Sequence, residues 1–171
     1  MRQKIVKLTL LTIFITIFSS CEEKLCGCTV VDADVNLIVT DSENRNLLDP
    51  STPEHFKEDD IRIYFLRNGQ REEAYAANLD APRYFRIDQS GPNGEYMMRL
   101  FPDLETHNSD ITTTIIRWNG SDEDTVACEI RNTDNSTIIT RVWYNDDLGY
   151  DQNDQRLSRY KRGPRLINVR K

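Results

Sequence analysis

The sequence contains few of the residue types on which catalysis and metal binding most often depend. It has only 2 His and 4 Cys, and the two histidines, His55 and His107, are isolated from each other. It also has no Gly-x-Ser-x-Gly turn, no phosphate-binding glycine loop and no His-Glu-x-x-His pair. We therefore predict no catalytic residue and no cofactor.

The sequence also lacks an apolar run long enough to cross a membrane as a helix. Residues 8–18 are apolar apart from three threonines, whereas a helix needs roughly 20 apolar residues to cross the hydrocarbon core. The run follows a short cationic start and ends at two serines. This layout is typical of a signal peptide and predicts a removable leader over residues 1–20.

The residue that follows the leader is Cys21. A small residue just before a cysteine resembles the lipobox of bacterial lipoproteins, in which the peptidase cuts before the cysteine and its thiol carries the lipid. Phe18 stands where Leu is usual, as in the looser lipoboxes of Bacteroidetes lipoproteins, and Glu22-Glu23 resembles their surface-export signal. We predict lipidation of Cys21, a tether over residues 21–30 and a lipid-anchored position in the bacterial outer membrane, exposed at the surface. The alternatives are an ordinary secretory signal and a retained transmembrane anchor.

Three further cysteines remain, at positions 26, 28 and 128. They do not supply the four ligands that a structural zinc site needs, and the stretch from Asp151 lacks the Gly and Glu of an EF-hand loop. No metal site is predicted. We expect Cys128 to form a disulfide with Cys26 or Cys28, because the export route leads to an oxidising compartment. The alternative is that Cys128 is a free cysteine of the core.

The distribution of charge argues against nucleic acid as a partner. The formal net charge is −6, although the leader is basic and the segment from Arg156 to Lys171 carries seven basic residues and no acid. The chain between them is therefore strongly acidic, whereas binding to a phosphate backbone requires a basic surface. We expect the basic C-terminal end to be a solvated strand or arm.

Beyond the leader the apolar residues recur with a period of two, and no stretch shows a helical stripe. Short runs such as "VNLIVTD", "IRIYFLRNG" and "ITTTIIRW" alternate in this way, and turn residues such as Asn68-Gly69 and Asn119-Gly120 separate them. About seven short strands predict an all-β, antiparallel β-sandwich of immunoglobulin-like or transthyretin-like type, with residues 31–171 as one domain. Residues 146–163 are polar and are expected to be mobile.

The aromatic residues are the candidates for ligand binding. Trp118 ends one expected strand, and Trp143 and Tyr144 end another. At the end of a sandwich they could form an aromatic platform for a sugar ring. The alternative is that one or both tryptophans fill the core, as large aromatic side chains mostly do.

The phrases "NLLDPSTPEHFKEDDIRIYFLRNGQ", "RWNGSDEDTV" and "VWYND" together resemble a group of small Bacteroidetes cell-surface lipoproteins of uncharacterised function. The resemblance covers most of the mature chain and implies a sandwich on a lipid anchor. The function that we expect is a non-catalytic surface module that binds a protein partner or a glycan. The alternatives are a structural component of an envelope complex and a hydrolase that uses paired carboxylates.

Overall fold

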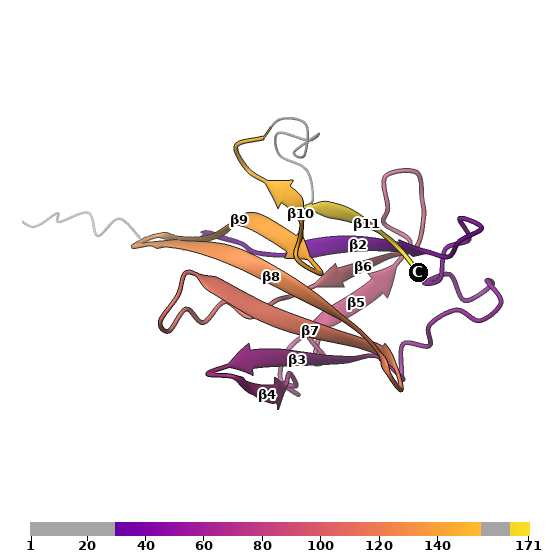
Figure 1. Ribbon diagram of the computed structural model, residues 1–171, viewed down its shortest axis with the longest axis horizontal. Helices are drawn as coiled ribbons and strands as arrows, with labels where there is room; N and C mark the ends of the chain where they lie inside the picture. The colour runs from indigo at the N-terminus through magenta and orange to yellow at the C-terminus, as the bar shows by residue number, and fades with distance from the viewer. Residues whose placement is uncertain (1–29, 155–164) are drawn as a thin grey trace, which may run out of the picture.

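The computed structural model describes residues 30–154 and 165–171 as an all-β fold, with no helix in either range (Figure 1). The predicted leader and most of the tether, with Cys21, Cys26 and Cys28, lie outside these ranges. No helix within the described part of the chain is long and apolar enough to span a membrane. The strands are β1 (Val30–Asp32), β2 (Val35–Thr40), β3 (Arg62–Arg67), β4 (Gln70–Glu73), β5 (Phe85–Asp88), β6 (Met97–Leu100), β7 (Ile111–Asn119), β8 (Asp122–Thr133), β9 (Ser136–Tyr144), β10 (Asp147–Asp151) and β11 (Leu166–Arg170).

The strands form two sheets. Sheet A has seven strands in the order β1-β9-β8-β7-β3-β4, with β10 also paired to β9, and sheet B has four in the order β11-β2-β6-β5. In Figure 1, β8, β7 and β3 lie in front of β2, β6 and β5. Side chains from both sheets join one apolar core, which includes Leu37 of β2, Met98 of β6, Ile116 of β7 and Val126 of β8.

The prediction of a purely antiparallel arrangement is wrong, because both sheets are mixed. β1 runs parallel to β9, and β11 runs parallel to β2. Both parallel pairs use strands near the ends of the described chain, and they join segments more than a hundred residues apart. Apolar periodicity identifies a strand but carries no information about the direction of a distant partner.

The number of strands also exceeds the expected seven. β4 consists of Gln70–Glu73, whose four residues are all exposed, and β1 has three residues, also exposed. Neither strand has a buried face, so neither shows apolar alternation. β10, within the stretch expected to be mobile, pairs with β9 through a register shift between Leu148 and Tyr150. That irregularity breaks the period of two on which recognition of a strand depends.

The turns follow the sequence closely. Asn68 and Gly69 join β3 to β4 with φ values of 51° and 75°, the left-handed conformation that a two-residue hairpin requires. The described part of the basic C-terminal end forms β11, which confirms a terminal strand. Its first basic residue is not solvated: Arg165 is 4% exposed, and its Nη1 lies 2.9 Å from Asp32 Oδ1.

Candidate functional site

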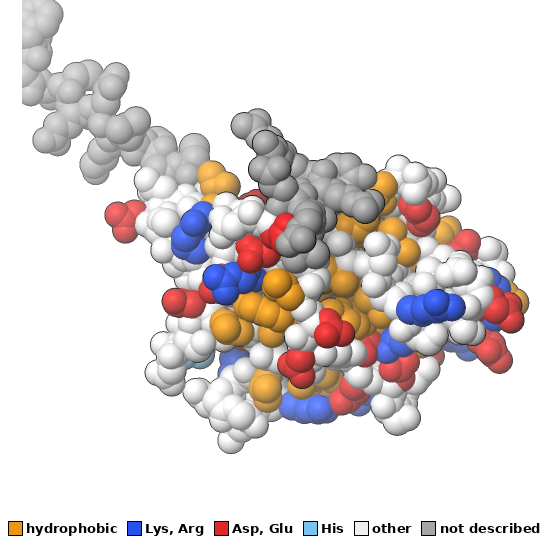
Figure 2. Space-filling model, turned by 45° about the horizontal axis from the view of Figure 1, so that its top comes forward, with side chains coloured by type: hydrophobic (Ala, Val, Ile, Leu, Met, Phe, Trp, Pro, Cys, Tyr) orange, Lys and Arg blue, Asp and Glu red, His pale blue; other side chains and the backbone are white. Residues whose placement is uncertain are grey.

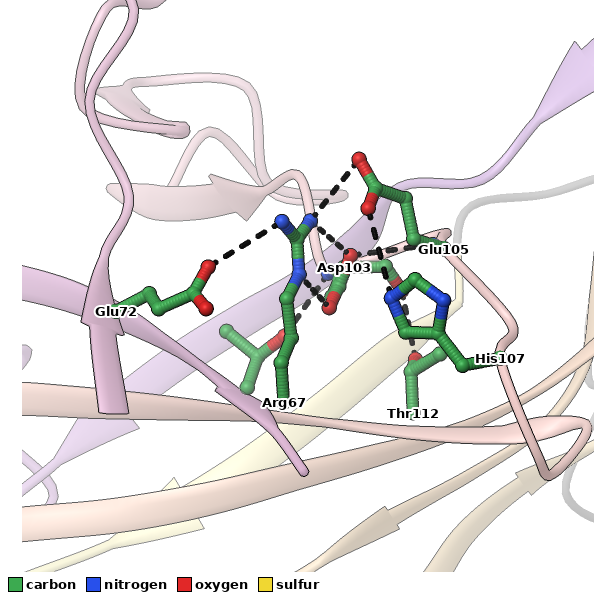
Figure 3. A network of polar contacts seen from close by, with 7 residues as sticks. Arg67, Glu72, Asp103, Glu105, His107 and Thr112 are labelled. Carbon is green, nitrogen blue, oxygen red and sulfur yellow. Dashed lines mark hydrogen bonds and ion pairs between the residues drawn. The ribbon is translucent and has the colours of Figure 1, made fainter. Parts of the chain in front are cut away.

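The segment between β6 and β7, residues 101–110, carries the chain from sheet B to sheet A. Pro102 and Asp103 at its start are buried. The Asp103 carboxylate accepts two hydrogen bonds from the Arg67 guanidinium at the end of β3, one from Nε and one from Nη2, each 2.8 Å long (Figure 3). This two-pronged pair fixes the carboxylate in position and orientation.

Two threonines of β7 hold the backbone of Asp103. The Thr112 hydroxyl donates to the Asp103 carbonyl oxygen over 2.6 Å, and the Asp103 N–H donates to Thr114 Oγ1 over 3.0 Å. Thr112 and Thr114 are two residues apart on the strand and therefore share its inner face. Both are buried, which is why the core contains hydroxyl groups at these positions.

Arg67 also reaches exposed acids around it. Its guanidinium lies 3.2 Å from Glu105 Oε1 and 3.4 Å from Glu72 Oε2, and its charged group stands 5.1 Å from the centre of the Phe65 ring. The hydrogen bonds to Asp103 raise the pKa of Arg67 above its ordinary value, against the effect of burial. This guanidinium is therefore engaged by three carboxylates and one aromatic ring of the protein itself.

A cavity of about 510 Å³ lies on one side of this Arg67–Asp103 pair. Its walls are mostly apolar and aromatic, and Asp34, Arg99 and Glu105 add charged groups. A smaller hollow of about 150 Å³, beside His107, lies on the other side and shares Asp103 and Glu105 with the first. The apolar residues that line the large cavity are Val31, Ala33, Phe65, Tyr84, Phe101, Pro102 and Leu104.

Tyr84 is held in a strained conformation at the wall of this cavity. Its φ of 59° falls in the left-handed region, which bulky residues rarely adopt. Backbone hydrogen bonds fix it on both sides: its N–H donates to Ala81, and its carbonyl oxygen accepts from the N–H of Phe101. The ring meets Phe65 edge to face, with centroids 5.0 Å apart. Strain of this kind persists where the surroundings enforce it, often at binding sites.

Arg99 makes fewer polar contacts with the protein than Arg67 does. Its Nε lies 3.4 Å from Asp34 Oδ2, and this atom is buried without a hydrogen-bond partner. Within the described ranges no hydrogen bond from its terminal nitrogens is found. Asp34 is shared, since its other oxygen lies 3.8 Å from the guanidinium of Arg165. The large cavity is therefore lined by an arginine that makes a single weak ion pair, whereas Arg67, beside Asp103, is held by two hydrogen bonds.

The structure does not bring the predicted aromatic residues together as one platform. Trp118 is fully buried and stacks on Phe56, with centroids 5.0 Å apart, so its ring offers no face to a ligand. Trp143 and Tyr144 are neighbours on β9 and therefore point to opposite faces of sheet A. Trp143 pairs with Ala127 and Leu148 and is partly exposed on the outer face.

Tyr144 points inward to a second polar cluster, around the buried carboxylate of Asp124. Trp118 Nε1 donates to Asp124 over 2.5 Å and Asn145 Nδ2 over 2.7 Å, and the Tyr144 hydroxyl and Lys171 Nζ donate to it as well. Burial, followed by the contact with Asp124, raises the pKa of the Tyr144 hydroxyl. These partners make Tyr144 part of a structural cluster rather than of a ligand platform.

Cys128 occupies a buried position on β8, as its apolar neighbours predict, and burial raises the pKa of its thiol to about 12. It forms no disulfide within the described residues. Its expected partners, Cys26 and Cys28, lie outside them, so the disulfide stays a prediction. In the same described ranges no group of three or more His, Cys, Asp or Glu is placed to hold a metal ion.

The outer face of sheet A carries hydrophobic side chains between charged ones, as Figure 2 shows. Trp143 and Leu148 belong to this face, and Leu148 is 42% exposed. The cavity residues lie elsewhere, and sequence reasoning missed all of them. No signal marks Arg67, Asp103, Tyr84 or Arg99 as special, because their roles arise from contacts between segments that are distant in the chain.

The carboxylates at the cavity are paired with arginines. Asp103 and Glu105 lie against Arg67, and Asp34 lies against Arg99. Carboxylates paired in this way are suited to holding the arginine side chains in position. The arrangement as a whole can enclose an apolar group of a ligand beside the partly exposed guanidinium of Arg99. Comparison of the chain with protein-family models, with curated proteins and with solved structures finds no match.

Proposed function

We propose that the protein is a non-catalytic binding module, anchored to the outer membrane through a lipid on Cys21, that binds a segment of a protein partner. The observation that carries the proposal is the cavity of about 510 Å³ with aromatic walls. Ligand sites typically have volumes of roughly 300–1,000 Å³, apolar walls and a few polar groups that orient the ligand. An apolar side chain of a partner fits such a site.

The geometry favours a protein partner over a glycan. A sugar ring needs an exposed aromatic face, and Trp118 is buried while Trp143 lies apart from Tyr144 on the opposite face of sheet A. The cavity walls are concave and apolar, which suits the side chains of a peptide. Support for a non-catalytic role comes from the pairing of the Asp34, Asp103 and Glu105 carboxylates with arginines.

The proposal includes the finer fold assignment and the relation to Bacteroidetes surface lipoproteins. Two sheets around one core support a sandwich of immunoglobulin-like or transthyretin-like type. The anchor rests on the leader and on Cys21 in the sequence. Replacing Cys21 with Ala is expected to abolish incorporation of labelled palmitate and to release the protein from the membrane fraction. Membrane association that persists in Cys21→Ala would contradict the anchor.

The binding role is tested by filling the cavity. Leu104 lines it and is partly exposed, so Leu104→Trp should occupy space that the ligand needs. Peptides selected from a displayed random library against the wild-type protein are expected to lose binding to Leu104→Trp. The matched control is Leu148→Trp, which places the same ring on the outer face of β10 and should leave binding unchanged. Selection of glycans but no peptides on parallel arrays would overturn the protein-partner proposal.

A further inference from the structure

We propose that the ligand of the large cavity presents an apolar group together with a carboxylate, and that Arg99 binds this carboxylate. The inference rests on the proposed function and specifies the chemistry of its ligand. A peptide that ends in an apolar residue with a free C-terminal carboxylate has this chemistry, as does a small arylalkyl carboxylic acid.

The first argument concerns the hydrogen-bond donors of Arg99. A guanidinium has five N–H donors in a planar fork and no acceptor. The Nε of Arg99 is buried without a partner, which is costly, because a desolvated donor normally finds an acceptor. Within the described ranges the terminal nitrogens donate no hydrogen bond either. An acceptor from outside these residues would satisfy the terminal nitrogens, which belong to a side chain that is 42% exposed.

The second argument is the contrast with Arg67, whose partner Asp103 lines the same cavity. Arg67 binds the Asp103 carboxylate through two hydrogen bonds of 2.8 Å. The chain thus already shows how an arginine beside this cavity holds a carboxylate. Arg99 has the same fork, but its ion pair with Asp34 is longer, with 3.4 Å between Nε and Asp34 Oδ2. The outer edge of the fork is left for a ligand, and a carboxylate matches it in shape and charge.

The third argument is the place of Arg99 relative to the apolar walls. Arg99 and Asp34 both line the cavity, and their contact places the guanidinium at its wall. Arg99 follows Met98 and precedes Leu100 on β6, and both of those side chains are buried. Arg99 therefore points away from the core, with 42% of its side chain exposed. A ligand could bury an apolar group against Tyr84 and Leu104 and keep its carboxylate at this exposed position.

The acids near Arg99 do not cancel its attraction for an anion. Among the described residues Asp34 is the one carboxylate that contacts Arg99, and it also accepts a hydrogen bond from Asn36 and lies 3.8 Å from Arg165. Glu105, the remaining exposed acid of the wall, lies 3.2 Å from Arg67 and 3.7 Å from His107. Each acid thus shares its charge with a second basic or donor group.

The test compares paired probes that differ only in the end group. N-acetyl-phenylalanine and a hexapeptide ending in Phe are titrated as free acids and as amides into the full processed protein in phospholipid nanodiscs, with empty nanodiscs subtracted. The free acids are expected to bind about tenfold more tightly than the amides, as the loss of a charge-assisted hydrogen bond implies. The same probes are then titrated into Arg99→Gln, where this preference should vanish.

Arg86→Gln is the matched control. Arg86 faces Arg99 in register on β5 and has its nearest acid, the exposed Asp80, at 3.9 Å, but it does not line the cavity. It should keep the preference for the free acid. Equal binding of acids and amides by the wild type, or an equal loss in Arg86→Gln and Arg99→Gln, would overturn the inference. Unfolding curves of both variants show whether either has lost its fold.

A third probe separates the two sources of the ligand. 3-Phenylpropionate carries the ring and the carboxylate without a peptide bond. Binding of the hexapeptide but not of 3-phenylpropionate supports a peptide C-terminus, and equal binding supports a small acid. Peptides that bind through internal residues, and that Leu104→Trp excludes, would overturn the carboxylate inference but leave the proposed function standing. Failure of every peptide and acid to bind at millimolar concentration would overturn both.

Discussion

Two buried aspartates lie near opposite ends of β7, and their surroundings differ. Asp103, beside the first residues of the strand, is bound by one arginine and borders a cavity. Asp124 lies beside the last residues and accepts hydrogen bonds from four side chains. Within the described residues these are the two buried carboxylates. At the Asp124 end of the strand, polar contacts surround the carboxylate, and we call this the closed end. The Asp103 end borders the cavity.

The difference separates a structural cluster from a binding site. At the Asp124 end the donors come from β7, β9, the following turn and the C-terminal Lys171, and Phe56 covers the indole. A satisfied buried network of this kind makes one arrangement rigid. At the Asp103 end, Tyr84 is strained and the buried Nε of Arg99 lacks a hydrogen-bond acceptor. Local violations of good packing and pairing concentrate where a protein binds something else.

The largest expected loss of stability comes from removing the Asp124 carboxylate at the closed end. Asp124→Ala leaves the donors of Trp118, Tyr144 and Asn145 without this acceptor and the Lys171 ammonium with Asp122 alone, and should lower the free energy of unfolding by about 3 kcal/mol. Urea unfolding followed by tryptophan fluorescence measures this. The control is Asp122→Ala, since Asp122 also contacts Lys171, at 2.7 Å, but is more exposed. It should cost less than about 1 kcal/mol. Equal losses would show that the buried network contributes nothing beyond a surface ion pair.

Replacing Asp103 should lower the stability less than replacing Asp124 does, but it should weaken ligand binding. Asp103→Asn keeps the shape of the side chain and removes its charge, leaving Arg67 with exposed Glu72 and Glu105 as partners. We expect a loss of about 2 kcal/mol, with weaker binding of cavity ligands, because residue 103 lines the cavity and its side chain is then held less firmly by Arg67. Glu72→Gln, which alters only an exposed contact, is the control. Unchanged ligand binding by Asp103→Asn would show that the Arg67–Asp103 ion pair takes no part in ligand binding.

A smaller effect is expected in the acid range. Burial disfavours the charged form of Asp124, but hydrogen bonds from Lys171, Tyr144, Asn145 and Trp118 together lower its pKa. An unfolded chain therefore takes up the proton at higher pH than the folded one, and Asp124 stabilises the fold above the ordinary aspartate pKa of about 3.9. This contribution is lost as the pH falls through the lowered pKa. Stability of Asp124→Asn should decline less than that of the wild type between about pH 5 and pH 2.

The comparison also explains which parts of the molecule the sequence predicts. Strand positions and the Asn68-Gly69 turn depend on neighbouring residues, so alternation and turn chemistry identify them, as with Val126, Cys128 and Ile130 of β8. β4 and β1 have no buried face and give no such signal. The Asp103–Arg67 pair joins residues 36 positions apart, and the parallel pairing of β11 with β2 spans most of the chain. Such long-range contacts depend on packing, which periodicity does not encode.

The smallest change in stability, with a large change in binding, is expected at Tyr84. Its φ of 59° favours glycine. Tyr84→Gly should therefore relieve strain worth about 1 kcal/mol or more, while losing an edge-to-face contact with Phe65 worth about 1 kcal/mol. The free energy of unfolding should change by less than about 1 kcal/mol, but the cavity loses an aromatic wall, and ligands should bind more weakly.

Asn145 provides the matched position at the closed end, with a φ of 47°. Asn145→Gly relieves the same kind of strain, but it removes a 2.7 Å hydrogen bond to Asp124 and a 2.8 Å hydrogen bond from the Thr125 N–H. This variant should be less stable by about 1–2 kcal/mol and should bind cavity ligands as the wild type does. If Tyr84→Gly is instead the less stable of the two and still binds ligand normally, the strained tyrosine serves the fold rather than the site.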